Sequence, residues 1–189
     1  MGRYSAYIDV ISQFKQSRKS IGMSVFNVLI DNSKTFTSGD QLEIYPFAQE
    51  AIQILTYKGY DLVFITGQPP RRTKDIEIND FENILNSLKQ MTAEFGGSVR
   101  ASYYTPSTDK NDPYVKPNIG MFKRAENENS IIWKDTFFIG CDKNDIKAAT
   151  SLPTTTILVG SSKIDNLDSS IQQFENILEF AKAVWLKSS

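Results

Sequence analysis

Histidine is absent from this chain of 189 residues, and cysteine occurs once, as Cys141. Without histidine the chain cannot form a Ser-His-Asp triad, a histidine general base or a histidine-ligated zinc site. A single cysteine excludes an intramolecular disulfide framework. Any chemistry that the chain performs must therefore rely on carboxylates, hydroxyls and amines.

Long apolar runs and a strong net charge are also lacking. No stretch of about 18 apolar residues suggests a transmembrane helix, and the first residues contain no apolar region typical of a signal peptide. The formal net charge is -1, so the overall charge favours neither nucleic acid nor a membrane surface. We therefore expect a cytoplasmic protein without a membrane partner, folded as one domain over residues 1–189.

Apolar patterns predict strands that alternate with helices along the chain. The strands are expected at residues 25–30, 60–66, 98–104, 136–140 and 154–159, and the last helix at 167–186. A helix over residues 4–18 precedes this core, because apolar residues recur there at helical spacing, namely Tyr4, Tyr7, Ile8, Ile11 and Phe14. The alternation predicts an α/β fold, a doubly wound (Rossmann-like) parallel sheet of about five strands with helices on both faces.

Polar groups that can act on a phosphate follow four of the predicted strands. These groups are Asp31, Thr66, Lys116 and the pair Asp142 and Asp145. The carboxyl ends of parallel strands meet at one edge of a sheet, where ligands bind in open α/β folds. A carboxylate can attack phosphorus, a hydroxyl and an ammonium can neutralise phosphoryl oxygens, and further carboxylates can hold Mg²⁺. The set therefore indicates phosphoryl chemistry.

The order of these groups resembles the four motifs of the haloacid dehalogenase (HAD) superfamily of phosphohydrolases. Residues 31–35, Asp-Asn-Ser-Lys-Thr, look like the first motif, D-x-D-x-T, and residues 60–66 look like the second, a strand that ends in Ser or Thr. Residues 116–121 are similar to the K-P-x-x-x-M of the third motif. That form occurs in the histidinol-phosphatase and heptose-bisphosphate phosphatase branch and in the phosphatase half of polynucleotide kinase-phosphatases. Residues 140–145 resemble the fourth motif, G-D-x-x-x-D.

The resemblance implies a role for each residue. Asp31 would be the nucleophile, while Thr66 and Lys116 would hold the phosphoryl oxygens, with Gly67 as a further phosphate-binding candidate. Arg71 and Arg72 follow the second motif's strand, so either they reach a distal phosphate or acid of the substrate or they form a solvated basic loop. Mg²⁺ would be held by Asp31, the carbonyl of Ser33, Asp145 and, if it turns inward, Asp142. Only 35 residues separate Asp31 from Thr66 and 50 separate Thr66 from Lys116, so no cap domain is expected. Open sites of this kind suit large substrates or a cap from another subunit, so an oligomer is compatible with this reading.

Two residues depart from the family pattern. Ser33 stands where the family has the Asp that protonates the leaving group, and serine cannot serve as an acid-base group near neutral pH. Cys141 aligns with a metal-binding Asp, although Mg²⁺ prefers hard oxygen ligands. We therefore expect weakly bound Mg²⁺, and no zinc.

Two principal functions stay open at this point. The first is an Mg²⁺-dependent phosphomonoesterase, slow or impaired, that acts on a phosphorylated small molecule. The second is a catalytically inactive protein of the same fold that binds a phosphorylated ligand or a protein partner. A phosphatase acting on nucleic-acid ends is a third alternative, which the net charge of -1 does not support.

Overall fold

The computed structural model describes residues 19–31, 42–68, 76–161 and 164–187. The predicted helix over residues 4–18 and the candidate site residues Ser33, Arg71 and Arg72 lie outside these ranges. Among the described residues, no helix is long and apolar enough to cross a membrane.

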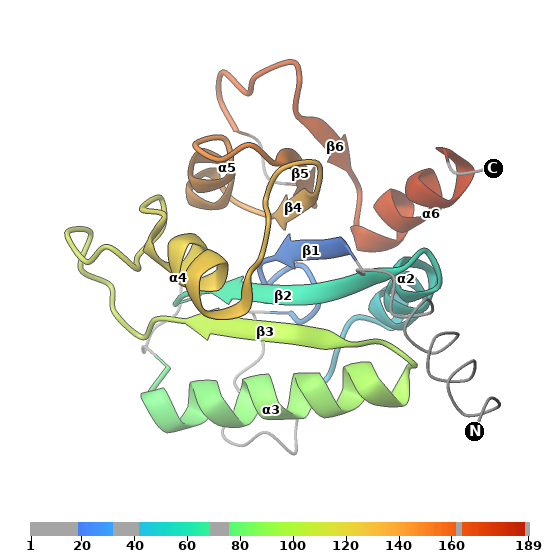
Figure 1. The fold of residues 1–189 in the computed structure, drawn as a ribbon, viewed down its shortest axis with the longest axis horizontal. Helices are drawn as coiled ribbons and strands as arrows, with labels where there is room; N and C mark the ends of the chain where they lie inside the picture. Colours follow the sequence, from blue (N-terminus) through green and yellow to red (C-terminus); the bar gives the residue numbers. More distant parts are fainter. Residues whose placement is uncertain (1–18, 32–41, 69–75, 162–163, 188–189) are drawn as a thin grey trace, which may run out of the picture.

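Six parallel strands form one sheet in the order β3-β2-β1-β4-β5-β6 (Figure 1). The strands are β1 (Lys19–Met23), β2 (Tyr60–Thr66), β3 (Val99–Tyr104), β4 (Phe137–Gly140), β5 (Thr155–Val159) and β6 (Gln172–Phe174). The helices are α2 (Pro46–Tyr57), α3 (Ile78–Glu94), α4 (Gly120–Asn129), α5 (Lys143–Ala149) and α6 (Ile177–Lys187). The predicted Rossmann-like parallel fold is confirmed.

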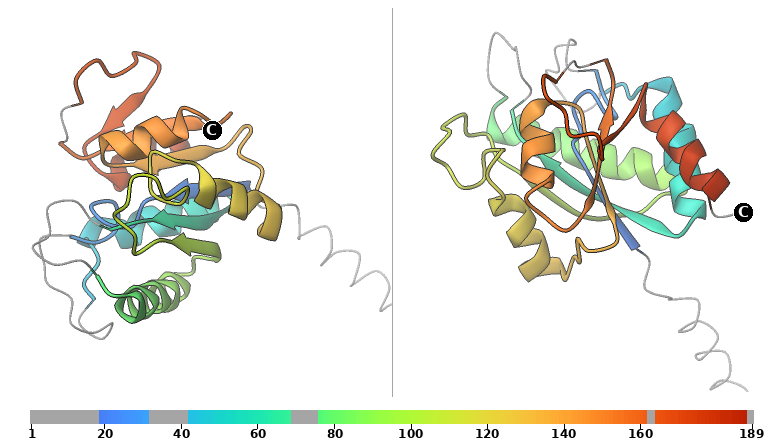
Figure 2. Two further views of the ribbon diagram at one scale, coloured as in Figure 1. Left: turned by 90° about the vertical axis from the view of Figure 1, so that its left-hand side faces the viewer. Right: turned by 90° about the horizontal axis from the view of Figure 1, so that it is seen from above.

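Helices cover both faces of the sheet. Side chains of α2, α3 and α6 share one hydrophobic core with the sheet, and side chains of α4 and α5 share a second core on the other face. Figure 2 shows α4 and α5 on one side of the strands and α2 and α6 on the other. Because apolar side chains enter both cores, the central strands are buried on both faces, as parallel sheets require.

The first strand is not where the sequence predicts it. The structure places β1 at Lys19–Met23, between β2 and β4, and the run Val25–Ile30 forms a tight turn instead. Within this turn the amides of Leu29 and Ile30 donate to the carbonyl of Val25, over 2.9 and 3.3 Å, and Asn27 has a φ of 60°. The prediction is wrong because the apolar side chains of the turn are buried in the core, and a buried turn gives the same apolar run as a buried strand.

The sixth strand is a second difference. The predicted helix over 167–186 is wrong in its first part, because Gln172–Phe174 forms β6 at the edge of the sheet beside β5. The helix begins only after Asn176, whose side-chain oxygen accepts hydrogen bonds from the amides of Leu178 and Glu179. An edge strand of three mostly polar residues is too short for its apolar residues to show the alternation that predicts a strand. The other four predicted strands agree with β2, β3, β4 and β5 to within one residue at each end.

Close packing at the middle of β1 generates a test of this strand assignment. A Cβ atom on Gly22 would lie 2.6 Å from Trp133 Cζ3 and 2.8 Å from Phe138 Cδ2, both in buried rings. We expect Gly22→Ala to lower the free energy of unfolding by about 1–3 kcal/mol through overpacking. Gly67→Ala is the matched control, because the nearest atom to its added Cβ would be 3.7 Å away. Urea denaturation of both variants measures the difference, and equal stabilities would contradict β1 at Lys19–Met23.

Candidate functional site

A cluster of polar side chains lies at the carboxyl ends of the three central strands. Ser24 directly follows β1, and its amide donates to the carbonyl of Ile139 in β4 over 2.9 Å. The Ser24 hydroxyl donates to Asp145 Oδ1 over 2.7 Å. Both side chains are nearly inaccessible to solvent, with Ser24 4% and Asp145 2% exposed. The end of β1 is therefore joined to the start of α5 by a buried hydrogen bond.

Lys116 completes this cluster from the loop between β3 and α4. Its ammonium donates to Ser24 Oγ over 2.7 Å, to the carbonyl of Ile65 over 3.0 Å, and to Asp145 Oδ1 in a short ion pair. An ammonium has three N–H donors, so these three bonds use all of them. Thr66, the last residue of β2 and 2% exposed, is next to the Ile65 carbonyl at the same strand end.

Short-range hydrogen bonds hold the loop that carries Lys116. The Asn118 amide group donates to the carbonyls of Lys110 and Asp112, and the amide of Gly120 donates to the carbonyl of Pro113 over 2.9 Å. Gly120 is needed there because a Cβ atom would lie 2.4 Å from the Pro113 oxygen. The loop therefore has a defined shape and does not rely on Lys116 alone.

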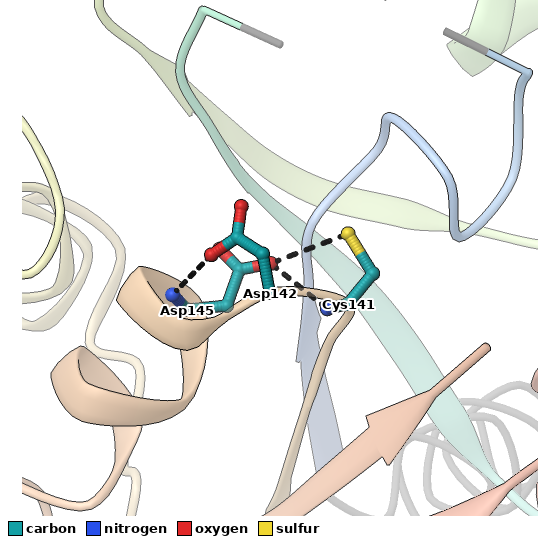
Figure 3. Close-up of side chains that lie close together, drawn as sticks. All are labelled: Cys141, Asp142 and Asp145. Carbon is teal, nitrogen blue, oxygen red and sulfur yellow. Dashed lines mark hydrogen bonds between the residues drawn. The ribbon is translucent and has the colours of Figure 1, made fainter. Parts of the chain in front are cut away.

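Asp145 is held by the first turn of α5 and by the amide of Cys141. Asp142 begins α5, and its side chain accepts hydrogen bonds from the amides of Asn144 and Asp145 over 2.8 and 2.9 Å. The amide of Cys141 donates to Asp145 Oδ2 over 3.0 Å, and the thiol lies 3.7 Å from the same oxygen (Figure 3). The close approach requires Gly140, because a Cβ atom there would lie 2.5 Å from the Cβ atom of Asp145.

The charges of this cluster shift three pKa values. Burial alone would raise the pKa of Asp145, but the ammonium of Lys116 and the hydrogen bonds from Cys141 and Ser24 bring it below its ordinary value. The pKa of Asp142 is raised, first by burial and then by the charge of Asp145. Burial, followed by the charges of Asp145 and Asp142, raises the pKa of the Cys141 thiol far above its usual range. The thiol is therefore protonated and inert near neutral pH.

The donor set of Cys141, Asp142 and Asp145 does not fit Mg²⁺. Their potential ligand atoms lie within 4.8 Å of one another. However, Asp145 Oδ1 already accepts from Ser24 and Lys116, and Asp145 Oδ2 accepts from the Cys141 amide. Asp142 Oδ1 accepts two amides of α5, so only the other oxygen of Asp142 is left for an ion. The third donor is a protonated thiol, whereas Mg²⁺ requires oxygen ligands in octahedral geometry. The ammonium of Lys116 supplies the positive charge that Asp145 needs.

The structure pairs Lys116 with Asp145 and places Thr66 at the end of the neighbouring strand β2. The residue bonded to both members of the pair is Ser24, which the sequence did not predict, and not Asp31. Asp31 is half-buried and follows the turn of residues 25–30. The pKa of Tyr45 is raised, mainly by burial and then by the nearby Asp31 and Cys141. The assignment of Asp31 as a nucleophile stays a prediction.

Ser24 and Phe26 are the site positions that sequence reasoning missed. If the first motif, D-x-D-x-T, is placed directly after β1, Ser24 stands at its first Asp and Phe26 at its second. Phe26 is 4% exposed and its ring packs edge-on against Phe81, with centroids 6.0 Å apart. The sequence analysis placed the motif at Asp31 and not at Ser24, because the motif is recognised by its first aspartate. The signal that could have revealed it is Asn27, a residue type that tolerates the positive φ observed in the turn.

The ion pair between Lys116 and Asp145 predicts a dependence of stability on pH. Because the folded pKa of Asp145 is lowered, its stabilising effect is fully present above about pH 3.9, the ordinary pKa of aspartate, and is lost as the pH falls through the folded pKa. Lys116→Met leaves a buried carboxylate unpaired, so we expect a loss of about 3–5 kcal/mol at neutral pH. In this variant burial raises the pKa of Asp145, so its stability should increase as the pH falls.

The matched control is the double variant Lys116→Met/Asp145→Asn, which contains neither charge and should recover much of the lost stability. Urea denaturation at several values between about pH 5 and 8, the range in which folded proteins are usually most stable, measures all three proteins. Equal losses in the single and double variants at every pH would show that Lys116 acts through packing and not through its charge.

Comparison with known proteins finds similarity in structure and not in sequence. The chain matches no protein-family model and no curated protein sequence. A D,D-heptose 1,7-bisphosphate phosphatase from B. bronchiseptica, solved with magnesium and phosphate, has a TM-score of 0.75 at 20% sequence identity, over 89% of this chain and 99% of that chain. The D,D-heptose 1,7-bisphosphate phosphatase from Burkholderia thailandensis has a TM-score of 0.66 at 18% identity, over 88% of this chain and 98% of that chain.

A HAD-superfamily hydrolase from Ehrlichia chaffeensis is also similar, with a TM-score of 0.63 at 13% identity over 90% of this chain and 97% of that chain. The three solved proteins are covered almost completely, so the resemblance includes the whole HAD core and not a shared fragment. The chain therefore has the fold of the HAD-superfamily phosphatases, as the order of its motifs predicts.

Proposed function

We propose that this chain is a HAD-fold protein that binds a phosphorylated ligand without hydrolysing it through an aspartyl-phosphate. The observation that carries this proposal is Ser24, which follows β1 and is hydrogen-bonded to both Lys116 and Asp145. In the family this strand end carries the nucleophilic aspartate, and a serine cannot form an acyl-phosphate.

Ser24 is also a weak candidate for a nucleophile of its own. Its hydroxyl donates to Asp145, whose lowered pKa makes it a poor general base near neutral pH. The other hydrogen-bond partner, Lys116, is an ammonium in an ion pair and cannot accept the proton. The serine is therefore a hydrogen-bonding group that connects the lysine and the aspartate.

The acid-base position supports the same proposal. Phe26 stands two residues after Ser24, where the family has the Asp that protonates the leaving group, and its ring is part of the hydrophobic core. General acid-base assistance typically contributes about 10²–10⁴-fold to a rate. A chain without this group and without an aspartate after β1 lacks both steps of the family reaction.

Magnesium binding is proposed to be weak. The structure from B. bronchiseptica contains magnesium and phosphate, but here the donor atoms around Asp145 are already hydrogen-bonded to Ser24, Lys116 and Cys141. A divalent ion would have to displace the Lys116 ammonium and would meet a protonated thiol. The expectation that the chain binds no zinc stays a prediction.

A phosphorylated ligand is the class that the remaining groups favour. Thr66, which ends β2, and the following Gly67 lie beside Lys116, and the resemblance assigns all three to phosphoryl oxygens. Lys116 would exchange one of its three internal hydrogen bonds for one to the phosphate. The uncharged Ser24 removes the repulsion that a carboxylate at the same position would exert on a phosphate. Arg71 and Arg72 are kept as proposed contacts to the ligand.

The first test is catalytic turnover of an aryl phosphate and of sugar and nucleotide phosphates at saturating Mg²⁺. We expect the wild type to show no hydrolysis above that of Asp31→Asn, because the proposal gives Asp31 no part in chemistry. Turnover that Asp31→Asn abolishes would overturn the proposal and would establish the slow phosphatase in its place. Far-UV circular dichroism of the variant shows whether it remains folded.

The second test is direct binding, measured by calorimetric titration with inorganic phosphate and with an aryl phosphate, with and without Mg²⁺. We expect saturable binding that is weakened about tenfold in Thr66→Val, since one hydrogen bond to a charged group contributes about 1.5 kcal/mol or more. Thr156→Val in β5 is the matched control, because Thr156 is also buried but is not at the carboxyl end of a strand. If phosphate does not bind, the proposed ligand is wrong and a protein partner becomes the better interpretation.

A further inference from the structure

The two edges of the sheet differ in length. β6, at one edge, has three residues, whereas β3, at the other edge, has six. In the part of the chain that the structure describes, β3 pairs with β2 alone, so its other side has no strand partner. Figure 1 shows β3 as the outermost strand, with α3 running alongside it. Proteins commonly keep edge strands short, charged or covered, because a long open edge pairs with another chain.

A groove follows the edge of β3 between α3 and α4. It has a volume of about 450 Å³, and its floor is the part of β3 at residues 101–104. The walls come from α3 on one side and α4 on the other, and they include Ile78, Lys89, Arg124 and Glu128. Ile78 is 52% exposed although it is apolar. A strand that pairs with β3 would therefore also contact side chains of both helices.

The α3 wall carries one acidic and one basic residue. Glu82 accepts a hydrogen bond over 2.9 Å from the hydroxyl of Tyr104, the last residue of β3. Lys89 comes seven residues later, about two turns, so it lies on the same side of α3. Because α3 connects two parallel strands, it runs against their direction, and Lys89 is nearer the amino end of β3. Among the described residues, Lys89 has no ion-pair partner.

The α4 wall carries the same two charges in the reverse order. Arg124 Cζ lies 5.5 Å from the centre of the Tyr103 ring, near the carboxyl end of β3. Glu128 is one turn later, and the carbonyl of the next residue, Asn129, accepts a hydrogen bond over 2.9 Å from Arg100 near the amino end. Along β3, the acidic residue therefore lies near the carboxyl end on one wall and near the amino end on the other.

We propose that β3 pairs antiparallel with β3 of a second copy of this chain, about a two-fold axis near Ser102, so that the two sheets become continuous. In such a contact each residue meets the residue at the same distance on the other side of the axis. On α3, Glu82 then faces Lys89 of the second copy. On α4, Arg124 faces Glu128 of the second copy. Every one of these contacts joins opposite charges.

Both walls are compatible with one axis at this position. Glu82 and Arg124 contact the last two residues of β3, and the carboxyl-terminal end of α4 contacts Arg100 near the first. The midpoints of the two charge pairs therefore lie beside the middle of β3, where Ser102 is small enough for two strands to approach. An unrelated extended peptide would pair with the same edge but would bring no helix to oppose the walls. Antiparallel pairing directs the two Ser24 sites away from each other, so the dimer is independent of the proposed phosphate binding.

Charge-reversal variants of α3 test this contact in the full chain. Lys89→Glu places acidic residues opposite each other in both symmetric contacts, and Glu82→Lys places basic residues there. We expect each variant alone to raise the Kd of the dimer about tenfold or more. A 1:1 mixture of the two variants should dimerise as tightly as the wild type, because opposite charges then meet in both contacts. Sedimentation velocity over a range of protein concentrations measures all four samples.

Lys147→Glu is the matched control, because it makes the same change of charge on an exposed residue of α5, which packs against β4 and β5. We expect it to leave the Kd unchanged. A wild type that is monomeric at every concentration would overturn the proposal, and so would a dimer that both single variants leave intact. A mixture that fails to recover the dimer would also overturn it, since the contact would then lack the two-fold symmetry. Far-UV circular dichroism shows whether each variant is folded.

Hydrogen exchange of the wild type gives a second measurement that requires no substitution. Amides on an open edge exchange faster than amides that are paired with another strand. We expect the protection of β3 amides to increase with protein concentration, and that of β6 amides, at the other edge, to stay constant. Protection of β3 that does not depend on concentration would contradict a dimer through this strand.

Discussion

The contact between Lys116 and Asp145 is the interaction on which the carboxyl edge of the sheet depends. It joins the loop after β3 to the first turn of α5, and through Ser24 and the Ile65 carbonyl it also joins the ends of β1 and β2. A buried carboxylate without a partner costs several kcal/mol. Three features bring the ammonium of Lys116 to the carboxylate of Asp145. They are the loop after β3, Gly140 at the end of β4 and the Asp142 cap on α5.

The same contact supports the proposal that the chain combines the fold of the HAD-superfamily phosphatases with a binding function. The HAD motifs that the sequence resembles place carboxylates at these strand ends, and carboxylate oxygens are ligands that Mg²⁺ prefers. Here the residue after β1 is a serine, the residue after β4 is a cysteine, and Asp145 is the single carboxylate at the centre of the cluster formed with Ser24 and Lys116. Lys116 balances the charge of Asp145 and, together with Ser24 and the Cys141 amide, forms hydrogen bonds to both oxygens of this carboxylate. This charge balance is the physical basis of the proposed binding function.

The two ends of the sheet differ in the side chains that they present. The carboxyl end holds the polar cluster, while the amino end presents exposed aromatic and aliphatic side chains from α2 and α6. Strands that are buried on both faces separate the two ends.

The sequence by itself determined the fold class and the positions of β2, β3, β4 and β5, because apolar runs alternate there with amphipathic helices and end in glycine or polar residues. It also predicted that Lys116 and Asp145 lie at the same edge of the sheet, where the structure pairs them. Only the tertiary structure decided where the first strand ends. Lys19–Met23 lies between two central strands although it contains a lysine, a serine and a glycine, and the more apolar run Val25–Ile30 is a buried turn. Burial, and not strand geometry, produces an apolar run, so the sequence could not distinguish Asp31 from Ser24 as the residue that meets the lysine.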